Sequence, residues 1–204
     1  MARRNDHSRK QLRAMAISTA RKIVSEEGFQ ALSARRVARE IGYTVGTLYL
    51  IFKNLDDMIL ALNEQTLTEL YTSLESSTES QANASELVEK ICLSYLSFAI
   101  KHRHLWVLVF EHELPAQQEM PSWYAEKIAM GIHLIELVLC QLVPKAKTEI
   151  INQSARSIWG GVHGVCMLAV SKKLDLTGIE SAEDQVVDLT QKYLRGLCYS
   201  YLQA

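Results

Sequence analysis

The chain has 204 residues, of which 48% are hydrophobic, so it is long enough to bury one substantial core or a small and a larger one. No run of roughly eighteen uncharged apolar residues occurs, and no apolar stretch follows the charged N-terminus, which excludes a typical membrane-spanning helix or signal peptide and predicts a cytoplasmic protein. Without a Cys-x-x-Cys pair, the four cysteines Cys92, Cys140, Cys166 and Cys198 are expected to be buried core thiols.

The charge is distributed very unevenly along the chain. The formal net charge is −1, but residues 1–53 hold eleven Lys and Arg against four Asp and Glu. The first 53 residues therefore carry +7 and the remainder carries −8. A basic segment on an acidic body favours contact with a polyanion such as DNA, although a solvated charged surface is also possible on charge alone.

Apolar residues recur at three- and four-residue steps nearly throughout, and no proline precedes Pro115, so the pattern predicts an all-α protein. The first helix should end at Gly28, since glycine suits the left-handed position after a helix. Its predicted buried stripe consists of Leu12, Met15, Ala16, Thr19, Ala20, Ile23 and Val24.

Two short helices joined by about three residues are predicted next, a layout typical of a helix-turn-helix, whose second helix enters the DNA major groove. Ser33 can cap the first, which Gly42 would end, and Thr44 can cap the second, which would run to Phe52. The residues expected to pack inward are Val37, Ala38, Ile41, Leu48 and Phe52. The outward polar set, a candidate DNA surface, is Arg35, Arg36, Arg39, Tyr43, Thr44, Thr47 and Tyr49.

The rest of the chain predicts a linking helix and a helical bundle. Asn54 is a plausible N-cap with Asp56 and Asp57 in the first turn, and Asn83 with Glu86 resembles a capping box. Further helices are expected near residues 104–113, 122–142, 148–173 and 182–202. We therefore expect a three-helix DNA-binding domain over residues 8–56 and a C-terminal ligand-binding and dimerisation bundle over residues 57–204.

The first 60 residues resemble the TetR family of transcriptional regulators. The resemblance rests on Leu-Ser-Ala-Arg-Arg-Val-Ala at 32–38, Gly-Tyr-Thr-Val-Gly-Thr-Leu-Tyr at 42–49 and Phe-Lys-Asn-Leu-Asp-Asp at 52–57. It implies that Tyr49, Lys53 and Ser33 contact phosphates and that Gly46 permits close backbone approach. The residues that it places at the groove entrance are Tyr43, Thr44, Val45, Gly46 and Thr47. Val45 departs from the common family pattern, and either contacts a thymine methyl or packs inward; Leu50 and Ile51 depart from it as well.

The C-terminal half carries a shorter resemblance. The segment 158–164 resembles the Trp-His-Gly signature of one C-terminal domain type found among TetR-like regulators. The resemblance implies that the last two long helices pair with those of a second copy, with Val162, Cys166, Val186, Leu189, Tyr193, Leu197 and Tyr201 at the interface. The pocket candidates, for each of which ordinary core packing is the alternative, are Trp106, Phe110, Trp123, Tyr124, Met130, His133, Trp159, His163 and Met167.

Together these features predict a homodimeric repressor that binds a palindromic double-stranded DNA operator and is released by a small-molecule ligand. No catalytic residues, cofactor or metal are expected, because no nucleophile elbow or phosphate-binding loop occurs and His102, His104 and His112 complete no ligand set. The alternatives are a sequence-tolerant architectural DNA-binding protein and a helical-bundle enzyme or carrier.

Overall fold

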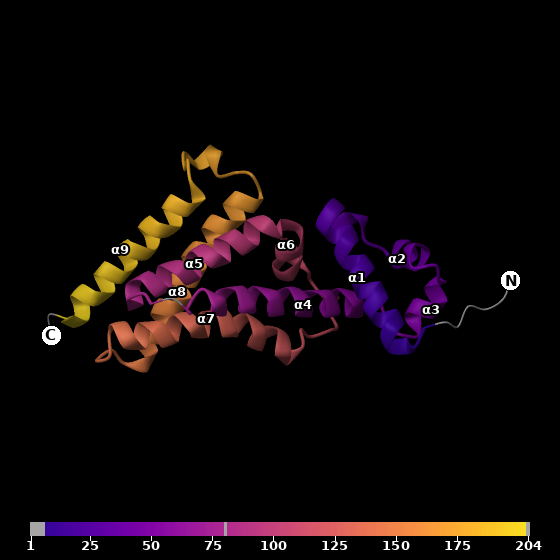
Figure 1. The fold of residues 1–204 in the computed structure, drawn as a ribbon, viewed down its shortest axis with the longest axis horizontal. Helices are drawn as coiled ribbons and strands as arrows, with labels where there is room; N and C mark the ends of the chain where they lie inside the picture. Colours follow the sequence, from indigo (N-terminus) through magenta and orange to yellow (C-terminus); the bar gives the residue numbers. More distant parts are fainter. Residues whose placement is uncertain (1–6, 80, 203–204) are drawn as a thin grey trace. The chain divides into compact units, whose positions relative to one another are not determined.

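A computed structural model describes residues 7–79 and 81–202, and all regular structure within these ranges is helical, as predicted. Arg3 and Arg4, which contribute to the predicted basic segment, lie outside the described residues. The helices, labelled in Figure 1, are α1 (Arg9–Glu27), α2 (Ala34–Glu40), α3 (Val45–Tyr49), α4 (Leu55–Ser76), α5 (Ala84–Lys101), α6 (Arg103–Glu111), α7 (Ser122–Leu142), α8 (Thr148–Val170) and α9 (Ala182–Leu202), with short 3-10 turns η1 (Phe29–Ala31) and η2 (Asp175–Thr177).

Packing divides the chain into two compact units. The head unit comprises Met1–Thr66 and His104–Glu119, and the body unit comprises Leu67–Arg103 and Met120–Ala204. The division therefore falls within α4, whereas the sequence predicted a boundary between residues 56 and 57. It also assigns most of α6 to the head, although α6 follows α5 of the body directly in the chain.

The head unit is built on α1, α2 and α3, with α2 packed against the other two (Figure 1). Ala16, Ala20, Val24 and Val37 are completely buried, so short side chains allow the helices to approach closely. The predicted stripe of α1 needs one correction. Ile17 is buried, whereas Met15 and Thr19 are only half-buried.

Three polar contacts attach α6 and the residue after it to the head. The Nδ1 atom of His104 lies 3.0 Å from the carbonyl oxygen of Ser25, and Asn63 donates from Nδ2 to the carbonyl oxygen of Leu108 over 3.4 Å. His112 is buried, and its Nε2 atom lies 3.0 Å from Oδ1 of Asp56. Since these partners lie in α1 and α4, tertiary contacts and not chain order place α6 in the head unit.

The body unit is a bundle in which α5 packs against α7, α8 and α9 (Figure 1). The predicted capping box at its start is confirmed, because Asn83 Oδ1 accepts from the Glu86 N–H at 3.0 Å and Glu86 Oε2 accepts from the Asn83 N–H at 3.2 Å. Buried Val88, Ile91 and Leu96 anchor α5 in the core.

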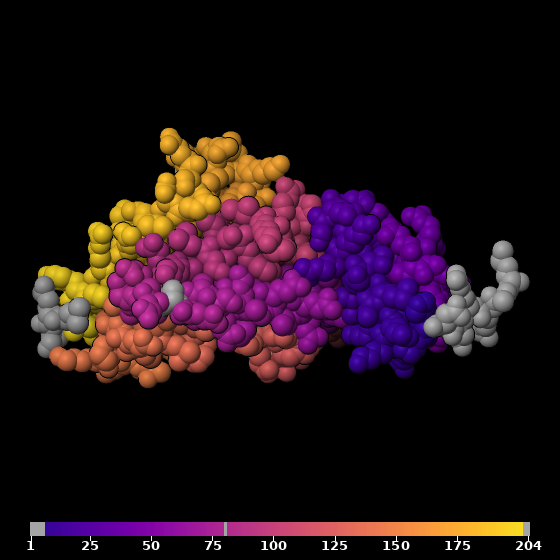
Figure 2. Space-filling view, viewed as in Figure 1, coloured from indigo at the N-terminus to yellow at the C-terminus, as the bar shows by residue number. Residues whose placement is uncertain are grey.

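The predicted bounds of α7 and α9 are confirmed, and three other helices end early, of which α6 ends at Glu111. α8 ends at Val170 because Lys172 adopts a positive φ of 55°, which turns the chain away. α3 ends at Tyr49, since the next two N–H groups bond to carbonyls only three residues back. The loop between α8 and α9 stands out from the surface of the body unit in Figure 2, and carries the highly exposed Leu176. None of the helices in residues 7–79 and 81–202 has the length and apolar character that crossing a membrane requires.

Candidate nucleic-acid interface

The first helix of the predicted helix-turn-helix is capped as expected. The Ser33 side chain accepts from the Arg36 N–H over 3.2 Å, so its hydroxyl hydrogen is still available to donate. Val37 and Ala38 anchor α2 in the head core, while Arg35 and Arg39 are exposed. The cap and the buried pair therefore fix α2 with two arginine side chains in solvent.

The turn between α2 and α3 depends on Gly42, whose φ of +76° is costly for any residue with a Cβ atom. The following N–H, from Tyr43, donates to the Ala38 carbonyl oxygen over 2.9 Å and closes the turn. Thr44 then caps α3, with its Oγ1 atom accepting from the Thr47 N–H over 3.2 Å. The two threonine hydroxyls lie 3.0 Å apart, so both sit at the N-terminal end of α3.

The short helix α3 has a sharply divided surface. Leu48 is 1% exposed, whereas the adjacent Tyr49 and Leu50 are 51% and 74% exposed. Val45 is half-buried and packs against the head core, as does Ile51, so core packing accounts for both apolar departures from the family pattern. Leu50 is different, because it places an apolar side chain on the exposed surface.

Gly46 leaves open space on the surface of α3. A Cβ atom added there would meet only Thr44 Oγ1, at an ordinary contact distance of 3.7 Å. Its backbone is helical, with no positive φ. Nothing within the described chain therefore requires glycine at this position. The prediction that Gly46 lets a binding partner approach the backbone closely is compatible with this open space.

The turn after α3 is held from two sides, and Lys53 projects from it. The Lys53 N–H donates to Asp57 Oδ2 over 3.0 Å, and the Asp57 N–H donates to Asn54 Oδ1 over 2.8 Å. The Arg13 guanidinium lies 4.7 Å above the ring of buried Phe52, a cation–π contact that ties this turn to α1. The Lys53 side chain is exposed on this rigid support.

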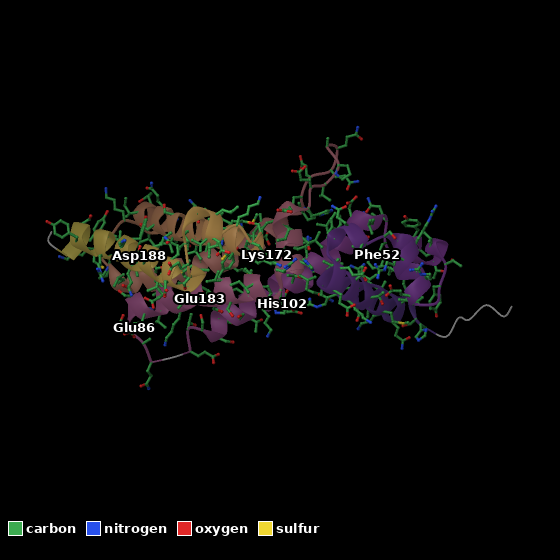
Figure 3. The ribbon with its side chains drawn as sticks, turned by 90° about the horizontal axis from the view of Figure 1, so that it is seen from above. Phe52, Glu86, His102, Lys172, Glu183 and Asp188 are labelled. Atoms are coloured by element: carbon green, nitrogen blue, oxygen red, sulfur yellow. The ribbon has the colours of Figure 1, made fainter. Side chains whose placement is uncertain are left out.

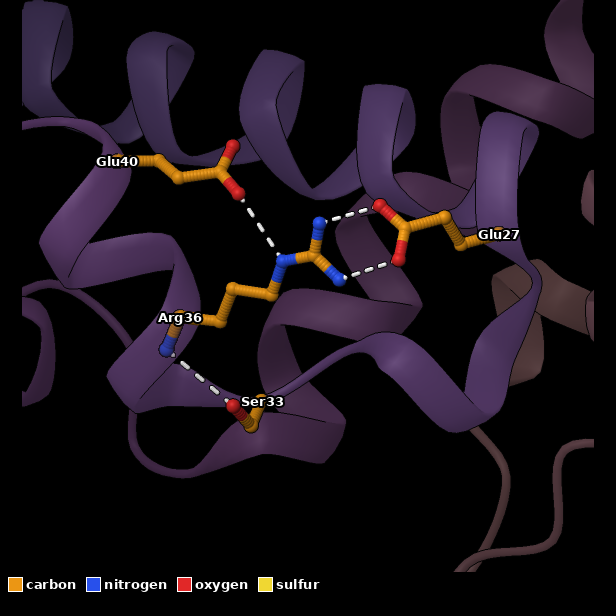
Figure 4. A network of polar contacts seen from close by, with 4 residues as sticks. All are labelled: Glu27, Ser33, Arg36 and Glu40. Atoms are coloured by element: carbon orange, nitrogen blue, oxygen red, sulfur yellow. Dashed lines mark hydrogen bonds and ion pairs between the residues drawn. The ribbon is translucent and has the colours of Figure 1, made fainter.

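Arg36 occupies a different environment from the other predicted DNA-binding residues. Its guanidinium donates from Nη1 to Glu27 Oε2 over 2.8 Å and from Nη2 to Glu27 Oε1, while Nε donates to Glu40 Oε1 over 3.0 Å (Figure 4). These bonds raise the pKa of Arg36, and the same pairing lowers the pKa of the Glu27 carboxyl. Two carboxylates thus compensate its charge, and Arg36 fastens α2 to the end of α1.

One further side chain reaches this surface without a signal in the sequence. His7, just before α1, lies with Nδ1 2.9 Å from the Tyr43 hydroxyl, 36 positions further along the chain. Only tertiary folding brings these two residues together.

The body unit contains a small apolar cavity with a polar pair beside it. The cavity has a volume of about 10 Å³, roughly the room of one water molecule. Its lining residues are Leu74, Ile91, Cys92, Tyr95, Gly131, Ile135, Trp159 and Val162. The Tyr95 hydroxyl lies 2.8 Å from Nδ1 of His163, whose ring stacks on Trp159, and burial lowers the pKa of this histidine.

The predicted pocket residues do not form one cluster. Trp106 and Phe110 pack on each other in the head unit, with ring centroids 5.0 Å apart, and the other seven belong to the body unit. Met130 is 39% exposed, and His133 pairs with Glu136 at the surface over 2.9 Å. Trp123 and Tyr124 contact each other, and Met167 is half-buried in α8. Of the predicted set, Trp159 lines the cavity and His163 lies beside it.

The predicted dimer residues divide by burial. Val162, Cys166, Val186 and Leu197 are each at most 8% exposed, because they pack inside their own bundle, so they offer little surface to a second copy. Leu189, Tyr193 and Tyr201 are half-buried. Open positions on α8 and α9 are instead Gly160, Gly164, Gly196 and Tyr199, since a Cβ added at any of these glycines meets nothing within 4 Å and Tyr199 is 69% exposed.

The four cysteines differ in environment, which corrects the expectation that all are buried. Cys140 is exposed and Cys198 half-buried, whereas Cys92 and Cys166 are buried. Burial raises the pKa of each buried thiol to about 12. In residues 7–79 and 81–202, no three His, Cys, Asp or Glu side chains gather closely enough to hold a metal ion.

Thiol labelling should follow this division. At neutral pH a maleimide should label Cys140 rapidly and leave Cys92 and Cys166 unmodified until the protein unfolds, because the reactive thiolate is roughly a thousandfold rarer at a pKa near 12 than at the ordinary value. Mass spectrometry of digested protein measures the rates, and Cys140→Ser should remove the rapid phase. Equal labelling of Cys92 in the folded protein would contradict the burial of this thiol.

Comparison with family models identifies both halves of the chain. Residues 16–62 match the model described as bacterial regulatory proteins, tetR family. Residues 88–191, just over half of the chain, match the model described as tetracyclin repressor-like, C-terminal domain. The predicted Trp-His-Gly subtype is not tested by these matches and stays a prediction.

Individual proteins show the same likeness. The fatty acid metabolism regulator protein of Bacillus subtilis is 23% identical over 92 residues, which cover 45% of this chain and 47% of that protein. The chain thus spans about half the length of the curated relatives that it matches.

Solved structures show the same fold over nearly the whole chain. A Rhodococcus sp. RHA1 protein of unknown function aligns with a TM-score of 0.77 at 22% identity, covering 96% of this chain and 98% of that one. BioQ, solved with its natural double-stranded DNA operator, aligns with a TM-score of 0.62 at 18% identity, covering 92% of this chain and 98% of that one.

Proposed function

Because this chain belongs to the tetR family of bacterial regulatory proteins, we propose that it is a homodimeric transcriptional repressor that binds a palindromic DNA operator and is released by a small ligand. The observation that carries the proposal is the N-terminal end of α3, where Thr44 and Thr47 are exposed or half-exposed on a helix anchored by buried Leu48. Since a regulator must reach the chromosome, the proposal includes a cytoplasmic location. It assigns the protein no enzymatic activity.

Within this proposal, the side chains of the head divide into two groups. Ser33, Arg35, Tyr49 and Lys53 contact phosphates, which set affinity and its salt dependence. Tyr43, Thr44, Gly46 and Thr47 lie at the base edges, which set sequence preference, whereas Val45 packs against the head core. Arg36 acts indirectly, by holding α2 against α1 through its bonds to Glu27 and Glu40.

The proposed homodimer and the proposed palindromic operator have matching geometry. Two heads about 34 to 36 Å apart can occupy half-sites one helical turn apart, which favours a palindrome. Double-stranded DNA as partner is supported by the likeness to BioQ, solved with such an operator. We place the dimer contact at the open positions on α8 and α9, where Gly160, Gly164 and Gly196 leave room for close helix packing and Tyr199 supplies apolar area.

The effector is proposed to enter the body unit at the cavity bounded by Trp159 and Tyr95. No Lys, Arg, Asp or Glu is among the residues that line it, so an uncharged, mainly apolar molecule fits best. Because the cavity holds only about one water molecule, binding must widen it. Screening uncharged compounds for release of bound DNA tests this; if only charged compounds act, and Tyr95→Phe leaves their effect unchanged, the effector site lies elsewhere.

Selection of bound DNA from a random duplex pool tests the function as a whole. Recovery of one palindrome, bound by two copies of the chain, is the expected result. Recovery of unrelated sequences with steep salt dependence would instead support a sequence-tolerant architectural protein. Absence of binding to any duplex would leave the enzyme or carrier alternative.

Substitutions in the head should separate affinity from sequence preference. Lys53→Ala should weaken binding to every duplex and reduce the slope of log K against log salt by about 0.9 per head. Thr47→Ala should chiefly change which bases are preferred, at a cost of about 1 to 3 kcal/mol for the selected operator. Lys145→Ala is the control, because it removes an exposed lysine from the body unit, between α7 and α8. Equal effects of Lys53→Ala and Thr47→Ala on all sequences would contradict the assignment.

A further inference from the structure

The residue before α1 is held in a defined position. Ser8 caps α1 reciprocally with Gln11: the Ser8 hydroxyl oxygen accepts from the Gln11 N–H over 3.3 Å, and Gln11 Oε1 accepts from the Ser8 N–H over 2.7 Å. Such a capping box fixes the direction of the chain entering the helix. The capping box therefore fixes the backbone next to His7 at the surface of the head unit.

The His7 imidazole lies at the N-terminal end of α3. Its Nδ1 atom is 2.9 Å from the Tyr43 hydroxyl, and the two rings meet edge to face with centroids 6.2 Å apart. Tyr43 directly precedes Thr44, the N-cap of α3. In a helix-turn-helix this end of the second helix faces the DNA groove.

The chemistry of this pair suits an anion. Nδ1 is engaged by the Tyr43 hydroxyl, while Nε2 of the exposed ring has no hydrogen-bond partner among the described residues. Among the described residues, the charged groups near it in the chain are the exposed cations Arg9 and Lys10, at the start of α1, and Tyr43 is the titratable group that faces it from the turn between α2 and α3. Asp6 directly precedes His7 in the sequence and lies outside the described residues. No described carboxylate pairs with this imidazole.

We propose that His7 is a DNA-phosphate contact of the head, held by Tyr43 so that its Nε2–H donates to a backbone phosphate oxygen. The inference rests on the proposed DNA binding and adds a residue that neither the motif nor the family likeness assigns. Histidine changes charge between about pH 5 and pH 8, and a phosphate favours the imidazolium, so this contact makes DNA affinity rise on acidification.

Binding to duplex DNA at two pH values tests the inference. The full-length protein is titrated with the selected operator and with a mixed-sequence duplex, at about pH 6 and about pH 8, over a series of salt concentrations. For the wild type, the slope of log K against log salt should be steeper at the lower pH by up to about 0.9 per head, since one more phosphate is neutralised. The effect should occur on both duplexes, because phosphates carry no sequence.

Two variants separate a phosphate contact from a merely structural pair. His7→Gln keeps a hydrogen-bond donor without a titratable charge, so it should bind like the wild type at pH 8 and lose the pH-dependent change in slope. Tyr43→Phe removes the hydroxyl that positions the imidazole and should weaken affinity severalfold at both pH values. His133→Gln removes an exposed histidine from the body unit and should leave the change in slope intact.

The possible failures are distinguishable. Retention of the pH-dependent slope in His7→Gln, or its absence in the wild type, would overturn the role of His7 while leaving operator binding in place. Equal affinity for all duplexes would overturn the operator but not the phosphate contact. Binding to neither duplex would overturn both.

Discussion

Phe52→Ala is expected to destabilise the head unit strongly and to weaken operator binding. Phe52 is 1% exposed, lies among the helices of the head in Figure 3, and carries the Arg13 guanidinium over its ring. Removing a buried phenyl ring leaves a cavity and costs about 3 to 5 kcal/mol. The free energy of unfolding of a whole domain is usually about 5 to 15 kcal/mol, so this loss is a large part of it.

Circular dichroism during urea unfolding, together with operator titration, measures both effects. Tyr49→Ala is the control for stability, because that side chain is half in solvent and its removal should change the free energy of unfolding by less than about 0.5 kcal/mol. A Phe52→Ala protein that unfolds at the wild-type urea concentration would contradict the described core.

Replacing Gly46 should change stability and DNA affinity in opposite directions. Gly46 lies in helical backbone, so Gly46→Ala should stabilise the free protein by up to about 1 kcal/mol through helix propensity. An added Cβ meets no close neighbour within the chain, so the folded head accommodates it. If the DNA backbone approaches this position closely, Gly46→Ala should weaken operator binding and Gly46→Leu should weaken it further. The loss in affinity is about tenfold for a clash of about 1.4 kcal/mol and about a hundredfold for about 2.8 kcal/mol.

Thermal unfolding and operator titration of the same preparations test this opposition. Ala129→Gly serves as the control for helix propensity, since Ala129 is exposed in α7 of the body unit and the reverse substitution should lower stability by up to about 1 kcal/mol without changing operator affinity. If Gly46→Leu binds the operator as tightly as the wild type, DNA does not approach α3 at this point, and the assignment of the groove entrance fails.

Features that depend on neighbours in the chain could be predicted from the sequence. The N-caps Ser33 and Thr44 and the capping box of Asn83 with Glu86 were predicted correctly, because each uses a side chain and an N–H group three residues away. The inward residues of the helix-turn-helix followed from periodicity in the same way, and Val37, Leu48 and Phe52 are buried as expected. The exposed Lys53 agrees with the motif, although its phosphate contact remains a prediction.

Features that depend on distant partners could not be predicted. The sequence placed Arg36 in an outward basic set, yet Glu27 at the end of α1 pairs with it, because the geometry of two helices brings a guanidinium and a carboxylate together. The His7 contact with Tyr43 likewise spans 36 positions. Neither partner is identifiable from spacing along the chain.

The sequence by itself determined the helices, their caps and the basic head, since local hydrogen bonds and apolar periodicity act within a few residues. Only the tertiary structure decided which apolar face of α8 and α9 is used within one bundle, burying Val162 and Val186 and leaving Gly160 and Gly196 open. It also decided that α6 packs with the head. A helix with apolar residues on more than one side shows no preference until a neighbour covers one of them, and that choice depends on the packing of the whole unit.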